Sequence, residues 1–311
     1  MRAAHFARHV ARSRRSLGAP VLLTLVAALA ISGCAASYGS AGRDTYRIAP
    51  YPSAASHPTA AEQATTLAAT EGYRRLVLVS AEKLDVDVLA IAHDAARGLC
   101  AAARQDELAA QGAFDVLRPV IAPDSATAEE LDGERWSIGV ARFGGLHAIE
   151  RALWTTPGCA AAGRLAAALA SEALAVGFVF YRVILTPDDI VATAQSELGW
   201  AVDVPLAGRE EQYSHHDLAD VLSAVATARA ALVLVAPLGR LVAPGPTSLA
   251  VARFSALDHE LSLIGANAAT SDGAVSSQTW RALATRIDGA LAPLGMLSGH
   301  VAGFGSGRLY A

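Results

Sequence analysis

The chain has 311 residues, and 53% of them are hydrophobic while only 6% are aromatic, which favours packed helices over sheets. Its formal net charge is −4, and the N-terminal stretch is strongly basic, so the rest of the chain is more acidic still. This balance argues against a nucleic-acid partner and suits a protein that handles cations.

Residues 1–33 have the parts of an export signal. Arginines in MRAAHFARHVARSRR precede the apolar run PVLLTLVAALAIS, which is too short for a comfortable membrane span. The following Ile-Ser-Gly-Cys resembles a bacterial lipobox, in which the cysteine is lipidated and becomes the new N-terminus. We therefore expect an exported protein, anchored through Cys34 at the extracytoplasmic or periplasmic face of the membrane. An arginine pair at 14–15 leaves Sec and twin-arginine export both open.

Residues 34–62 are rich in Ser, Ala, Gly and Pro, which predicts a flexible tether. Helical periodicity dominates beyond it, and no Asn-Gly or Asp-Gly turn stands between two strands of alternating polarity. The expected helices span residues 63–82, 85–120, 128–155, 160–182, 187–200, 215–236, 247–264 and 276–295.

The proline and glycine break at 156–160 divides these helices into two sets of similar size. The sequence therefore predicts an all-α fold of two antiparallel helical bundles, at 63–158 and 159–311. Phosphate loops, dinucleotide-binding glycine motifs and a serine nucleophile elbow are all absent from the sequence, so nucleotide chemistry and serine hydrolysis have no support.

Two cysteines remain besides Cys34. Cys100 and Cys159 would face an oxidising compartment after export, where a disulfide forms if their Cα atoms lie close enough. The sequence leaves that pairing open.

The stretch GGLHAIERALW at 144–154 places His147 and Glu150 one helical turn apart on the apolar side of a helix. Buried imidazole and carboxylate groups need partners, and a shared metal ion would serve both. A buried ion pair without metal is the alternative. In the zinc protease motif H-x-x-E-H, a second histidine follows the glutamate directly. Here Arg151 occupies that position, which weakens a protease interpretation.

A second polar cluster, EEQYSHHD, covers residues 210–217. His215 projects onto the apolar stripe of the following helix, so His215 and Glu211 are the candidates to complete a site with His147 and Glu150. Asp217 has a simpler role in helix capping with Ser214.

Together these segments resemble the imelysin family. GGLHAIERALW is similar to its GxHxxE motif, and EEQYSHHDLADV is similar to the EE-x-YSH-x-DL segment of its EfeO and EfeM branch. LTPDDIVATA and GAFDVLRPV resemble further segments of that branch, and the similarity spans roughly residues 70–300. The resemblance implies two helical bundles with the GxHxxE residues near their junction.

That resemblance also implies a function. EfeO and EfeM proteins are exported iron-uptake components that work beside a membrane permease and a haem peroxidase. Iron, ferrous or ferric, is therefore the expected metal, with zinc as the other option, and catalysis is not required. An imelysin-type zinc metallopeptidase and a non-catalytic helical scaffold lipoprotein are the two alternatives.

One departure from the branch is Leu117-Arg118-Pro119, where the branch has Ile-Glu-Pro. A cation replaces a carboxylate expected near the site. Arg118 would therefore repel a metal ion or pair with Glu150.

Overall fold

The computed structural model describes residues 58–121, 125–137, 140–155, 158–180, 184–203, 213–214, 216–268 and 276–304. The predicted signal, the lipidation site Cys34, most of the tether and the candidate ligands Glu211 and His215 lie outside these residues. Ser56–Ala311 forms one compact unit with its own hydrophobic core. The described residues are helical apart from one short hairpin, which confirms the all-α prediction.

The first described helix, α3 (Ala60–Ala96), is nearly twice as long as predicted. It begins with a capping box, because Thr59 and Glu62 bond each other's backbone amides. Its buried positions continue at spacings of three and four through Leu84, so the break predicted at 83–84 is wrong. The helix ends before Gly98, whose φ of 75° is easy only for glycine.

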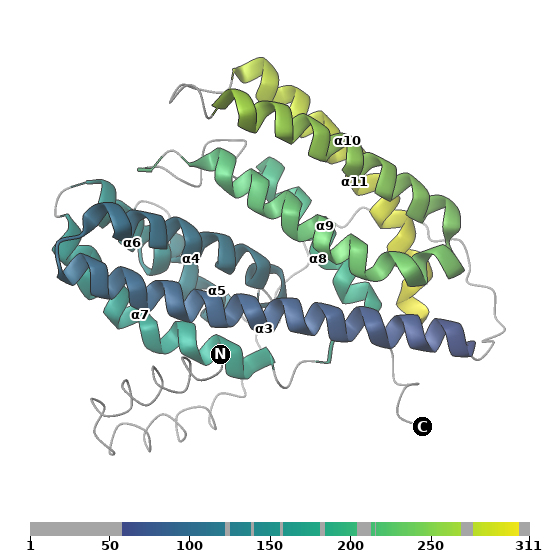
Figure 1. Ribbon diagram of the computed structural model, residues 1–311, viewed down its shortest axis with the longest axis horizontal. Helices are drawn as coiled ribbons and strands as arrows, with labels where there is room; N and C mark the ends of the chain where they lie inside the picture. The colour runs from purple at the N-terminus through teal and green to yellow at the C-terminus, as the bar shows by residue number, and fades with distance from the viewer. Residues whose placement is uncertain are drawn as a thin grey trace. The chain divides into compact units, whose positions relative to one another are not determined.

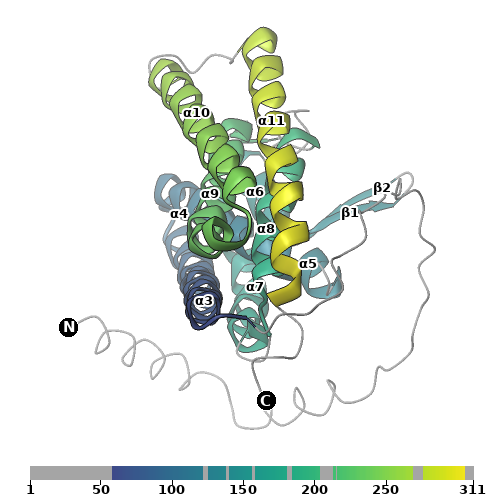
Figure 2. The same cartoon turned by 90° about the vertical axis from the view of Figure 1, so that its right-hand side faces the viewer.

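The predicted helices 85–120 and 128–155 are also wrong as single elements, and the first of them is divided between the end of α3 and the next helix. The chain forms α4 (Cys100–Ile121), α5 (Ser125–Asp132), an antiparallel pair β1 (Glu134–Ser137) and β2 (Val140–Phe143), and α6 (Gly145–Trp154). The two strands pair from Glu134 with Phe143 to Ser137 with Val140 and stand out from the helices (Figure 2).

The remaining helices agree with the prediction to within a few residues, except at the C-terminal ends of α9 and α11. They are α7 (Cys159–Phe180), α8 (Pro187–Asp203), α9 (Asp217–Val242), α10 (Pro244–Ala268) and α11 (Ser277–Val301), followed by the short 3-10 helix η2 (Ala302–Phe304). A capping box starts α8, because the Thr186 amide donates to Asp189 and the Asp189 amide donates to Thr186.

Helix packing defines two groups. The long helix α3 packs along α4 and α7, and α6 packs on α4 and α7 (Figure 1). In the second group α8 and α10 both pack on α9 and α11. The sequence analysis placed the boundary between the two bundles at 158, before α7. Because α7 packs on α3, it belongs by these contacts to the first group, which therefore ends at Phe180.

The two groups share one core. α9 packs on α3 and α4 of the first group, and α8 also contacts both of them. By length and composition alone α7 and α9 could each cross a membrane. The apolar sequence of α9 has another explanation in this fold, because the helix contacts neighbours in both groups.

Cys100 and Cys159 form a disulfide, with their Cα atoms 5.5 Å apart. They are the first residues of α4 and α7, so the bond ties together the starts of two helices that both pack on α3.

Candidate metal centre

Glycines place the start of α6 against the end of α5. Gly145 has a φ of 45°, and a Cβ at this position would overlap the carbonyl of Leu131. The Gly144 amide donates to the carbonyl of Gly133 at 3.1 Å, which closes the base of the hairpin. The close approach of α5 and α6 therefore requires the glycine of the GxHxxE motif, which is Gly145.

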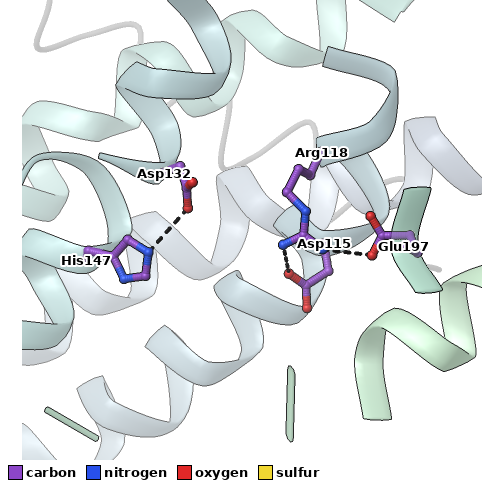
Figure 3. A network of polar contacts seen from close by, with 5 residues as sticks. All are labelled: Asp115, Arg118, Asp132, His147 and Glu197. Atoms are coloured by element: carbon purple, nitrogen blue, oxygen red, sulfur yellow. Dashed lines mark hydrogen bonds and ion pairs between the residues drawn. The ribbon is translucent and has the colours of Figure 1, made fainter. Parts of the chain in front are cut away.

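This approach sets His147 beside Asp132. The imidazole Nε2 of His147 lies 3.4 Å from Oδ1 of Asp132, and its Nδ1 lies 3.6 Å from Oε2 of Glu150. His147 and Glu150 are 2% and 1% exposed, as expected for the apolar side of the helix. One imidazole thus stands between two carboxylates in the core (Figure 3 shows the Asp132 contact).

The other oxygen of Glu150 reaches the second motif. Its Oε1 accepts hydrogen bonds from the backbone amides of Tyr213 at 2.9 Å and Ser214 at 2.8 Å. The guanidinium of Arg151 lies 5.8 Å from the Tyr213 ring, and Trp154 meets His216 edge-on at 5.9 Å. The GxHxxE helix and the Tyr213-Ser214 segment, 63 residues apart in sequence, therefore contact each other directly.

The N-cap residue of α9 is His216, not Ser214 as expected. His216 is half-buried against Trp154.

A second polar cluster surrounds Arg118. Its guanidinium bonds Oδ1 of Asp115 at 3.1 Å and Oε2 of Glu197 at 2.8 Å (Figure 3). The guanidinium also lies over the ring of Trp200, 3.3 Å from the ring centroid. Asp115 and Glu197 are both fully buried. Arg118 therefore connects α4 of the first group to α8 of the second.

The two clusters influence each other. Burial raises the pKa of Asp115, and the charge of Asp132 raises it further, while Arg118 and a hydrogen bond from Ser223 act in the opposite direction. Asp132 also contacts His147. The structure thus joins His147 to the Arg118 cluster through two carboxylates, neither of which the sequence analysis singled out.

The raised pKa of Asp115 predicts how stability depends on pH. In the unfolded chain an aspartate ionises near pH 3.9, whereas in the folded protein Asp115 keeps its proton to higher pH. The folded state then binds more protons, so this group's contribution to the free energy of unfolding is full below about pH 3.9 and falls as pH rises through the raised pKa. Urea unfolding from pH 4 to 7 should show Asp115→Asn gaining on the wild type as pH rises.

The control is Asp288→Asn, which removes an exposed carboxylate from α11. A difference between wild type and Asp115→Asn that stays constant over this pH range would contradict the expected titration.

A preformed metal cage needs at least three donor side chains around one point. Among the residues that the structure describes, no three His, Cys, Asp or Glu side chains are gathered closely enough to hold a metal ion. His147, Glu150 and Asp132 supply imidazole and carboxylate donors of the type that iron and zinc accept. Two of the four predicted ligands, Glu211 and His215, lie outside the described residues and stay predictions.

No protein-family model and no curated protein matches the sequence. The imelysin resemblance stays a prediction. In the structure, α6 and residues 213–214 meet at Glu150.

Proposed function

We propose that the protein is an exported, lipid-anchored metal-binding protein, the iron-capturing component of an EfeO/EfeM-like bacterial uptake system. His147 and Glu150 are its central ligands, and Glu211 and His215 contribute from the second motif. The ion lies near the junction of two antiparallel helical bundles of the imelysin type. Its partners, by the same resemblance, are a membrane iron permease and a haem peroxidase.

The observation that carries this proposal is the meeting of the two motifs. Glu150 accepts two backbone amides from Tyr213 and Ser214 with one oxygen, which leaves its other oxygen directed to the His147 side. A carboxylate fixed in this way is oriented for a ligand before the ligand arrives.

One observation favours the scaffold alternative. His147 already has carboxylate neighbours on both ring nitrogens, and the described residues hold no complete cage. In that case the polar centre is a buried ion-pair network, and the folded protein binds no metal.

Calorimetric titration separates these functions. The chain from residue 34 onward, with Cys34→Ser so that it carries no lipid, is stripped with chelator and titrated with Fe(II), Fe(III) and Zn(II). We expect binding by the wild type and its loss in a His147→Ala, Glu150→Gln double variant. Glutamine at 150 keeps an oxygen for the two amides, so the fold is preserved.

A second readout is stability. A metal at 100 times its Kd should raise the free energy of unfolding of the wild type by about 2.7 kcal/mol and leave the double variant unchanged. A His93→Ala, Glu82→Gln variant on the exposed side of α3 is the matched control and should behave as the wild type. Absence of binding by the folded wild type would establish the scaffold function instead.

A further inference from the structure

Helix α7 has an apolar sequence that its packing explains only in part. It packs on α3, α5 and α6, and Figure 1 shows it at the lower edge of the helices, below α3. Ala162, Ala166 and Val176 are buried on its inner side. Yet only 39% of its most apolar stretch is buried, against 56% for α9, the other described helix that is apolar enough to cross a membrane. The outer side of α7 is therefore both apolar and exposed.

This exposed side carries almost no charge. Among the exposed residues in the described part of α7, Arg164 and Ser171 are the only polar ones. The others are Ala160, Leu165, Ala167, Ala168, Leu174, Ala175 and Phe178. The only carboxylate of the helix, Glu172, is half-buried and accepts a hydrogen bond from Ser171. A helix that faces water normally carries charged residues on its outer side, so this side suits an apolar partner.

Two large side chains dominate the surface. Leu174 and Phe178 are 51% and 66% exposed, and they lie one helical turn apart on the same side of α7. Large apolar side chains that are exposed together mark a site of contact with a protein or a membrane.

The packing of α7 on α3 fixes where these side chains lie along the unit. A Cβ at Gly163 would contact Ala95, whereas a Cβ at Gly177 would lie beside Ala81. Rising residue numbers on α7 therefore correspond to falling numbers on α3. The end of α7 that carries Phe178 is level with the middle of α3.

The predicted lipid anchor lies within reach of this end. Ala81 is roughly 33 Å along α3 from Thr59, at the start of the helix. The segment 34–57, which joins Cys34 to the described chain, can extend over roughly 80 Å. A lipid on Cys34 and the exposed side of α7 can therefore meet the same membrane.

Other occupants fit this surface less well. α7 is 22 residues long, so its exposed side offers on the order of 350 Å², whereas each partner in a stable dimer buries about 800 Å². The apolar run at 20–32 belongs to the predicted signal, which is removed before Cys34. A membrane needs no large matched interface, because the anchor already holds the protein at its surface.

We propose that the exposed side of α7 lies on the membrane that holds the lipid anchor, with Leu174 and Phe178 inserted into its apolar layer. The helix lies in the membrane surface and does not span it, since its inner side belongs to the hydrophobic core. The inference rests on the proposed lipid anchor and adds an orientation to the proposed function. Because α6 packs on α7, this orientation keeps His147 and Glu150 close to the membrane, where a permease would take up the ion.

Quenching of tryptophan by brominated lipids tests the contact. In the chain from residue 34 onward, Cys100 and Cys159 form the disulfide, so Cys34 is the only free thiol. This thiol is coupled to a maleimide lipid in phosphatidylcholine vesicles with brominated acyl chains, which quench fluorophores that reach the apolar layer. Phe178→Trp then reports on α7, and the anchored wild type, with its four tryptophans, gives the background.

The emission added by Phe178→Trp should fall by about half or more in these vesicles. It should stay quenched at high salt, because an apolar contact is not screened. The control is Leu263→Trp on α10, where leucine is 52% exposed, and its added emission should be unchanged. Absence of quenching at position 178, or quenching that high salt abolishes, would overturn the inference.

A carboxylate on the same side of α7 should remove the contact. In the Phe178→Trp background, Leu174→Glu should abolish most of the added quenching, since a charged group stays out of the apolar layer. Leu263→Glu in the same background is the matched control and should leave the quenching intact. Both leucines are exposed, so both variants should fold, which circular dichroism checks. Equal quenching in the two glutamate variants would contradict insertion of α7.

Three further measurements separate this inference from the proposed function. A dimer of the Cys34→Ser chain in sedimentation, lost in Leu174→Glu, would assign this side of α7 to a second copy and overturn the inference. Calorimetric metal binding should be unchanged in Leu174→Glu, so a failed vesicle test leaves the proposed metal binding intact. Absence of lipid on Cys34 in the mass spectrum of the exported protein would overturn the anchor of the proposed function, and this inference with it.

Discussion

Replacing Arg118 by methionine is expected to lower the free energy of unfolding by about 3 to 5 kcal/mol. The guanidinium bonds Asp115 and Glu197, which are both fully buried, and it also covers the ring of Trp200. Its removal leaves two buried carboxylates without their shared cation. The loss also disconnects α4 from α8, and hence one helical group from the other. Urea unfolding at pH 7 measures the change.

A second arginine provides the control. Arg229 pairs with Asp258 at a similar distance, 2.9 Å, but this pair is exposed. Arg229→Met should cost only about 0 to 1 kcal/mol, because water replaces the lost partner. A triple variant with Asp115→Asn, Arg118→Met and Glu197→Gln should recover much of the stability lost in Arg118→Met. Equal costs for the two single arginine variants would show that burial does not set the strength of the Arg118 pairs.

Arg118 also shows what the sequence could and could not predict. Its replacement of an expected glutamate was recognisable, and so was its importance near the site. Its partners were not, because Glu197 lies 79 residues away and belongs to a helix whose packing on α4 the periodicity does not reveal. Through its bonds to Asp115 and Glu197, the Arg118 side chain has a structural role. The sequence analysis considered only Glu150 as its partner.

Local patterns predicted the helices where the ends carry strong signals. The capping box at Thr186 and the glycine and proline break at 156–158 both lie at helix boundaries. The hairpin was missed because residues 134–143 contain no Asn-Gly or Asp-Gly turn and no proline. Gly133 and Gly145, which bound it and have positive φ, were its available signal.

The polar face of α4 had a signal in the sequence as well. Glu107, Gln111 and Asp115 recur every four residues and are buried beside Ala110 and Phe114. Polar residues one turn apart on the apolar side of a helix indicate a buried polar face, as they do for His147 and Glu150. The predicted helix 85–120 joined the end of α3 to α4, so the pattern of α4 was not considered by itself.

Opening the disulfide between Cys100 and Cys159 is expected to cost about 4 kcal/mol, since the bond closes a long loop and restricts the unfolded chain. The sequence separation of 59 residues encloses α4, the hairpin and α6, and with them Arg118, His147 and Glu150. For a unit of this size the melting temperature should fall by about 8 to 16 °C. Thermal unfolding of the Cys34→Ser chain with and without reductant measures the change.

A Cys100→Ala, Cys159→Ala variant distinguishes loss of the bond from other effects of the reductant. Its melting temperature should equal that of the reduced wild type and should not respond to reductant. The same variant tests how far the enclosed segment depends on the bond: Arg104 still holds α4 to the end of α6 through Leu153, so the register of the two helices should survive. The free energy of metal binding should then change much less than the free energy of unfolding. A variant as stable as the oxidised wild type would contradict the expected role, and it would mean that packing of α4 and α7 on α3 alone restricts the ends of the loop.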